Sequence, residues 1–279
     1  MTSAEKQIIA GYDGSPDSEQ ALDWAAGEAR LHKAVLVICH AWQPGPATFE
    51  SGAASTAAQR CGEQLLADAM HQAQTGLGCA QIRPLLAAGP PAQVLCELSS
   101  TAAMVVVGSR GHDRLAKALL GSVSLQVAAY ADGSVTVVRG HWRPVRDRAV
   151  APVVVGADGS GPAQAAMAFA FEEAARRAAP LRLVCALADT PGVLGAAHKI
   201  EADFDQAIAK YEPDYPEVAV ERLVRQGAPR SALLEAANGA QLLVVGARGR
   251  GDMREMHLGS VSLAVLHHAP CPVSIIREG

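Results

Sequence analysis

The sequence predicts two tandem doubly wound α/β domains, each a five-stranded parallel sheet with helices on both faces. Three observations lead to this fold class. Short runs of Val, Ile and Leu occur without polar alternation, which is typical of strands buried on both faces. Alanine-rich segments of helical length separate these runs, and the whole pattern occurs twice in 279 residues. The chain is also long enough for two separate cores.

The first half provides five apolar runs that we interpret as strands. They cover Ile8–Tyr12, Val35–His40, Ile82–Ala87, Met104–Gly108 and Val135–Arg139. Helices are expected between them, including Asp17–His32 and Thr56–Thr75. Ser15 followed by Pro16 suits a helix N-cap with proline in the first helical position.

The second half repeats this order. Its expected strands lie near Pro152–Ala157, Leu181–Ala186, Val218–Val224, Gln241–Gly246 and Val273–Arg277. The section 189–217 is less regular, and we expect one helix there, around His198–Tyr211, closed by Pro213 and Pro216.

Repeated motifs support a duplication of the whole unit. Each half has an apolar run ending in Asp-Gly-Ser, a Gly-x-Pro placed 19 residues before a strand-ending glycine, and the identical pentapeptide Gly-Ser-Val-Ser-Leu, at 121–125 and 259–263. The polar, basic segment 139–148 contains Gly and Pro and reads as a linker. We therefore expect domains at 1–143 and 144–279, with the boundary near Pro144.

Composition excludes several classes of partner. The net charge of -4 provides no general attraction to nucleic acid or anionic lipid, so neither is expected as a partner. The apolar runs are far shorter than the roughly 20 residues that span a bilayer. No export signal is visible at the start, and six cysteines without a CxxC pair indicate reduced thiols. These features predict a cytoplasmic protein without a structural zinc site.

Both halves carry the spacing Gly-x2-Gly-x9-Gly-Ser, which predicts a phosphate-binding loop. The glycines are Gly108, Gly111 and Gly121 in the first half and Gly246, Gly249 and Gly259 in the second. A strand ends at the first glycine and a helix begins after the last, so free N–H groups and the helix dipole face the same point. The hydroxyls of Ser122, Ser124, Ser260 and Ser262 are further candidate ligands of phosphate or a metal.

Residues that end the first two strands are expected beside this loop, because parallel sheets bind ligands at the carboxyl ends of their strands. Asp13 and Asp158 are candidates for a ribose or a base edge. The ends of the second strands, Cys39–Ala41 and Cys185–Leu187, are expected to line an adenine pocket. The alternative for each aspartate is an Asx turn or helix cap without a ligand.

With these motifs the sequence resembles a tandem member of the universal stress protein family, over almost the whole chain. The resemblance implies the adenine nucleotide alpha hydrolase-like fold, ATP bound with a divalent metal such as Mg²⁺, and a homodimer, other homo-oligomer or intramolecular pseudo-dimer. It also implies a role in stress or dormancy. The candidate nucleotide-binding residues are Asp13, Ala41, Gly89, Gly108, Gly111, Gly121, Ser122, Val123, Ser124, Asp158, Leu187, Gly227, Gly246, Gly249, Gly259, Ser260, Val261 and Ser262.

Two segments depart from the family pattern. The family usually shows Ala-Pro-Cys-Pro-Val before the last strand, and the second half has it at 269–273. The first half has Ala131-Asp-Gly-Ser-Val135 in its place. The second loop also carries the polar segment Asp252–His257. Arg110 and Arg248 lie within the loops, where contact with phosphate and exposure to solvent are both open.

A binding module without catalysis is the leading functional hypothesis, since no P-loop lysine, base or nucleophile is found, and no catalytic or metal-ligating residue is assigned. A slow ATP hydrolase and a pseudo-dimer with vestigial sites are the alternatives.

Overall fold

The computed structural model describes residues 5–43, 51–76, 81–111, 120–140, 142–145, 150–187, 202, 204–249 and 257–278. The chain divides into two compact units, Met1–His141 and Trp142–Gly279. Each unit is an α/β domain built on a parallel sheet, which confirms the predicted fold class.

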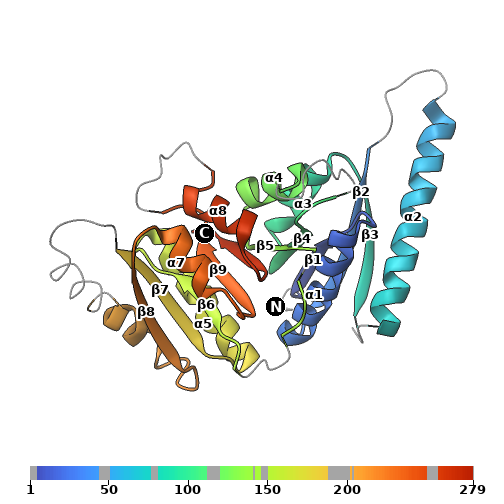
Figure 1. Cartoon of the computed structure of the whole chain (residues 1–279). Helices are drawn as coiled ribbons and strands as arrows, with labels where there is room; N and C mark the ends of the chain where they lie inside the picture. Colours follow the sequence, from blue (N-terminus) through green and yellow to red (C-terminus); the bar gives the residue numbers. More distant parts are fainter. Residues whose placement is uncertain are drawn as a thin grey trace. The chain divides into compact units, whose positions relative to one another are not determined.

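The sheet of the first unit has the order β3-β2-β1-β4-β5 (Figure 1). All four strand pairs are parallel. The strands are β1 (Gln7–Gly11), β2 (Val35–Trp42), β3 (Ile82–Ala88), β4 (Met104–Gly108) and β5 (Val135–Val138). The order turns back at β1, because β2 and β3 extend to one side of it and β4 and β5 to the other.

Helices cover both faces of this sheet. α1 (Pro16–His32) and α2 (Ser51–Gly76) contact each other, as do α3 (Pro91–Ser99) and α4 (Ser122–Tyr130). α1 packs on β1 and β4, and α2 packs on β2 and β3 (Figure 1). Two successive connections on each face give the doubly wound topology that right-handed crossovers require.

The second unit has the matching order β8-β7-β6-β9-β10. Its strands are β6 (Val153–Gly156), β7 (Leu181–Leu187), β8 (Val220–Gln226), β9 (Leu242–Gly246) and β10 (Val273–Ile276). Its helices include α5 (Gly161–Arg177), α7 (Pro229–Ala236) and α8 (Ser260–His268), and residues 204–211 are also helical. The rest of the helix expected around His198–Tyr211 lies largely outside the described residues.

Buried aliphatic strands form the core of each unit. Ile8 and Ile9 of β1 are buried, and so are all three valines of β6. Their uninterrupted apolar sequence therefore reflects helices on both faces. Alanines of α1 and α5, such as Ala21, Ala25 and Ala166, are fully buried and let the helices approach the sheet closely.

Both helices that follow the first strand of a unit begin with a serine cap. Ser15 Oγ accepts a hydrogen bond from Ser18 N at 3.3 Å, and Ser160 Oγ accepts one from Ala163 N at 3.3 Å. Pro16 occupies the first helical position of α1. This confirms the predicted cap, and it fixes the start of each helix beside the end of the strand before it.

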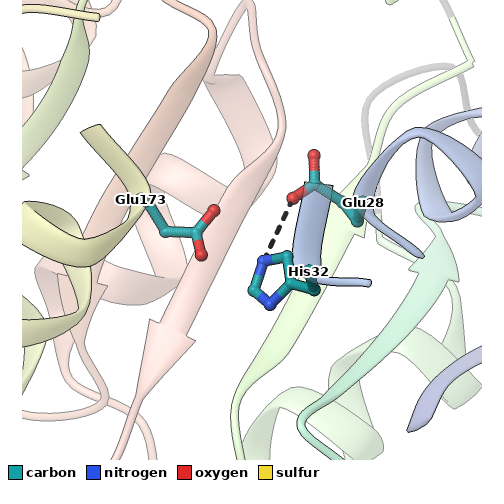
Figure 2. A group of neighbouring side chains, drawn as sticks. All are labelled: Glu28, His32 and Glu173. Carbon is teal, nitrogen blue, oxygen red and sulfur yellow. Dashed lines mark ion pairs between the residues drawn. The ribbon is translucent and has the colours of Figure 1, made fainter. Parts of the chain in front are cut away.

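Each of these two helices also carries its own pair of an acidic and a basic side chain one turn apart. His32 Nε2 lies 3.6 Å from Glu28 Oε2 on α1 (Figure 2). The equivalent residues of α5 are Glu173, labelled in the same figure, and Arg177, which are also ion-paired. The duplication therefore extends to side-chain interactions within the helices.

Within the described parts of the chain, no helix combines the length and the apolar character needed to cross a membrane.

Candidate nucleotide-binding sites

Each unit has a cavity beyond the carboxyl ends of its first, second and fourth strands. In the first unit this cavity measures about 320 Å³, enough for a nucleotide-sized ligand that is partly exposed. It lies where the strand order turns back between β1 and β4, which is where open parallel sheets bind ligands. The equivalent cavity of the second unit measures about 110 Å³.

The glycine-rich loop is closed by a backbone hydrogen bond in both units. Gly121 N donates to Ser109 O at 2.8 Å, and Gly259 N donates to Ala247 O at 2.8 Å. These bonds join the start of the last helix to the residue after the fourth strand. The two ends of the loop are therefore fixed at one point, although residues 112–119 and 250–256 lie outside the described part of the chain.

Two buried serines strengthen this closure. Ser124 Oγ donates to Ser109 O at 3.0 Å or to Gly121 O at 2.9 Å, and Ser262 Oγ donates to Gly246 O at 2.7 Å. A hydroxyl that donates to a carbonyl has no second proton for phosphate. In this structure Ser124 and Ser262 therefore hold the helix against the loop.

The helices that begin at the loop have no side-chain cap. α4 begins after Gly121 and α8 after Gly259. Both glycines are in the extended conformation, and neither helix start has a side-chain capping hydrogen bond. By contrast, α1 and α5 are capped by serine side chains. An uncapped helix start leaves N–H donors and the positive end of the dipole directed at the cavity, which is a site for an anion.

The first glycine of each loop is required by packing. A Cβ on Gly108 would lie 2.6 Å from Asp17 C, and one on Gly246 would lie 2.8 Å from Pro162 C. The fourth strand therefore ends in backbone contact with the first helix of its unit. This contact brings the loop beside the end of the first strand.

Asp13 and Asp158 form Asx turns. Asp13 Oδ1 accepts from Ser15 N at 2.9 Å, and Asp158 Oδ1 accepts from Ser160 N at 2.9 Å. The other oxygen of Asp13 faces the loop, since a Cβ on Gly111 would lie 2.8 Å from Asp13 Oδ2. The turn anticipated as the alternative is therefore present, and the same carboxylate still lines the cavity.

The end of β2 forms the other wall of the first cavity. His40 Nδ1 lies 2.8 Å from Tyr12 O, so the ring is held by the backbone. Ala41 and Cys39 also line the cavity. Burial raises the pKa of the Cys39 thiol to about 11, so this cysteine is protonated at neutral pH.

Strand register identifies Ala186 as the counterpart of Ala41. Gly11 pairs with Cys39 and Gly156 pairs with Val184, so Ala41 and Ala186 each lie two residues beyond the pair. Leu187, named from the sequence, instead corresponds to Trp42, and both carbonyls accept from a glycine N–H, at Gly227 and Gly89 respectively. The predicted strand ends Cys39–Ala41 and Cys185–Leu187 match Cys39 with Cys185, which is one residue out of register.

A charged cluster lies behind the loop of the first unit. Asp17 Oδ2 accepts from Ser109 Oγ at 2.6 Å and from Arg110 Nε at 3.2 Å. Burial, and next the Arg110 charge, lower the pKa of nearby Arg139, whereas Asp17 raises it. The Arg110 side chain is thus engaged by a carboxylate at the edge of the cavity. In the second unit Pro162 and Ala247 replace Asp17 and Ser109.

The predicted residues divide into those that line a cavity and those that do not. In the first unit the cavity is lined by Asp13, Ala41, Gly108, Gly111, Gly121, Ser122, Val123 and Ser124. In the second it is lined by Asp158, Gly246, Gly249, Val261 and Ser262. Outside the cavity linings lie Gly89, Leu187, Gly227, Gly259 and Ser260. Gly89 and Gly227 serve turns with positive φ, at 139° and 109°.

Several lining residues were not named from the sequence as site residues. They include Tyr12, Pro91 and Leu95 in the first unit and Pro229 and Leu233 in the second. Pro91 and Pro229 begin the helices that follow the predicted Gly-x-Pro motif. The Gly-x-Pro motif therefore does mark the cavity wall, but its proline and the helix that follows line the cavity, and its glycine does not.

Together, the fold and these cavities define a tandem α/β protein with a glycine-rich loop at the start of the last helix of each unit. The model of the universal stress protein family matches residues 5–139 and 150–277, so the chain belongs to this family. A universal stress protein of Mycobacterium tuberculosis is 35% identical over 100% of both chains. The crystal structure of one from Archaeoglobus fulgidus covers 99% of this chain and 100% of that chain, with 20% identity and a TM-score of 0.76.

A single-domain match is also found. The crystal structure of a universal stress protein in complex with cAMP covers 50% of this chain and 99% of that chain, with 30% identity and a TM-score of 0.39.

Proposed function

We propose that this protein binds ATP, with Mg²⁺, at its glycine-rich loops and acts as a nucleotide-dependent regulatory module in a stress or dormancy response. The observation that carries the proposal is the uncapped start of α4 and of α8 beside a closed loop. Two equivalent helix starts without a side-chain cap suit a polyphosphate.

The walls of the cavity suit the remainder of an adenine nucleotide. Asp13 offers carboxylate oxygens for ribose hydroxyls, and the backbone at Ala41, together with Leu95 and Val107, provides an edge and apolar contact for a base. The chemistry of the donors also fits Mg²⁺, which is held mainly by phosphate oxygens and water. The exposed Ser122 and Ser260 hydroxyls are the groups that would hold it, and bound Mg²⁺ would neutralise phosphate charge.

We further propose binding without catalysis, in the cytoplasm, with ATP changing the homo-oligomer or the protein partner that the chain forms. The support is that the titratable groups beside the loop already have structural partners. Asp13 accepts from the Ser15 amide, and Asp17 accepts from Ser109 and Arg110. Neither arrangement provides a residue that activates water.

Proline at the first helical position tests this proposal directly. Ser122→Pro and Ser260→Pro each remove one N–H donor, while the preceding glycines have ψ of 156° and 160°, which a residue before proline adopts readily. The controls Ser122→Ala and Ser260→Ala remove only the hydroxyl. Mg-ATP affinity is measured by titration calorimetry, with cAMP as a competitor.

Loss of one hydrogen bond to a charged group costs about 1.5–3 kcal/mol, so each proline variant should weaken its own site about 10- to 100-fold. The alanine variants lose only the hydroxyl, and because Mg²⁺ is held mainly by phosphate oxygens and water, they should weaken binding less than the proline variants do. Unchanged affinity in both proline variants, or no ATP binding by the parent protein, contradicts the proposal. Phosphate release by the parent, measured over hours, would replace the binding module with a slow hydrolase.

A further inference from the structure

The second unit has a cavity of about 450 Å³ beside its proposed nucleotide site. It lies between α5 and the helical residues 204–211 and is lined on those sides by Met167, Phe204 and Ala207. It shares Ala157, Asp158, Ala163 and Ala186 with the nucleotide cavity but contains none of the loop glycines. It therefore extends from the strand ends away from the phosphate loop.

A larger side chain occupies the corresponding position in the first unit. Tyr12, which corresponds to Ala157, is 7% exposed. Its pKa is raised by burial and next by Glu19 on α1, with a further contribution from Asp68 on α2. Tyr12 is thus a bulky, buried residue at the position where Ala157 borders the open cavity of the second unit.

A second replacement acts in the same direction. His40 packs against α2, since a Cβ on Gly62 would lie 2.9 Å from His40 Cδ2. Its counterpart in the second unit is the smaller Cys185, which lines the large cavity. Two large side chains of the first unit are thus replaced by small ones at the same edge of the sheet.

Charge differs between the two locations as well. Glu19, Asp23 and Asp68 contribute carboxylates around Tyr12 in the first unit. The second unit has Gln164 and Ala168 in place of Glu19 and Asp23, and Lys210 lines the cavity. Asp158, the counterpart of Asp13, is the one carboxylate in the described lining of the second unit's cavity.

We propose that the second unit accepts a purine nucleotide enlarged at the base end by an apolar group, whereas the first unit accepts only the unmodified nucleotide. This inference rests on the proposed function. With phosphates at the loop and the ribose at Asp158, a purine placed at Ala186 would have the extra cavity beside it, because Ala186 lines both cavities. Phe204, Met167 and Ala207 provide the apolar surface for the added group.

The test compares ATP with two enlarged probes, N6-benzyl-ATP and 2-benzylthio-ATP, by calorimetry on the full chain. Ala157→Tyr should introduce the side chain of the first unit and weaken binding of the enlarged probe by at least about tenfold more than it weakens binding of ATP. Tyr12→Ala is the reverse variant and should create a second site for the probe. Circular dichroism checks that each variant is folded.

Binding of either probe by the parent protein and its loss in Ala157→Tyr and Ser260→Pro, but not in Ser122→Pro, supports the inference. ATP binding at the second unit without binding of either probe overturns the inference and leaves the proposed function intact. Probe affinity that is unchanged in Ala157→Tyr also overturns it. Absence of binding by ATP and both probes overturns the inference together with the proposed function.

Discussion

At the scale of single residues, Asp23 is placed unfavourably for a carboxylate. Its Oδ1 is buried and has no hydrogen-bond partner among the residues that the structure describes. Burial, and next the charge of Glu19, raise its pKa. The counterpart in the second unit is Ala168, which carries no charge. Folding of the first unit therefore disfavours the charged form of Asp23 relative to the unfolded chain.

We predict that Asp23→Asn increases the free energy of unfolding at neutral pH. Because the pKa is raised in the folded state, the parent loses stability as pH rises from the unfolded pKa of about 3.9 through the folded pKa. The gain for the variant should be at most about 1 kcal/mol, since the carboxyl is only part-buried. Urea unfolding at several pH values measures it. A gain that persists unchanged below the unfolded pKa would rule out this cause.

At the scale of elements, most strands could be predicted from the sequence because each is an uninterrupted apolar run. The cap of α1 could also be predicted, because Ser15 and Pro16 specify it locally. The register of β7 against β6 was less accessible. It depends on hydrogen bonds between strands distant in sequence, and Cys185 offered a misleading match to Cys39.

The backbone contact between β4 and α1 leads to a prediction about the free energy of unfolding of the first unit. Gly108→Ala should lower the free energy of unfolding by about 1–3 kcal/mol or more, because its Cβ would lie 2.6 Å from the backbone of Asp17. Gly121→Ala is the matched control, since its Cβ would find its nearest atoms at 3.4 Å and its φ is -69°. Chemical denaturation monitors both variants, and equal destabilisation would contradict the packing argument.

At the scale of the whole molecule, the duplication could be read from the sequence but the divergence of the two sites could not. Identical Gly-Ser-Val-Ser-Leu segments located both helix starts. The exchange of Tyr12 for Ala157 gains a meaning only once the cavity beside Ala157 is located. Likewise, Asp17 becomes relevant to the loop only because packing brings it within 2.6 Å of Ser109 Oγ.

Two sites in one chain should stabilise their own units separately. A ligand that binds only the folded state adds about 2.7 kcal/mol at 100 times its dissociation constant. We therefore expect saturating Mg-ATP to slow amide hydrogen exchange in β1 and β4 as well as in β6 and β9. In Ser122→Pro at the same ATP concentration, protection should fall in β1 and β4 and remain in β6 and β9, and Ser260→Pro should give the reverse pattern. Mass spectrometry of peptides from each unit measures this, with the alanine variants as controls. Equal loss of protection in both units from either single substitution would mean that the sites act as one.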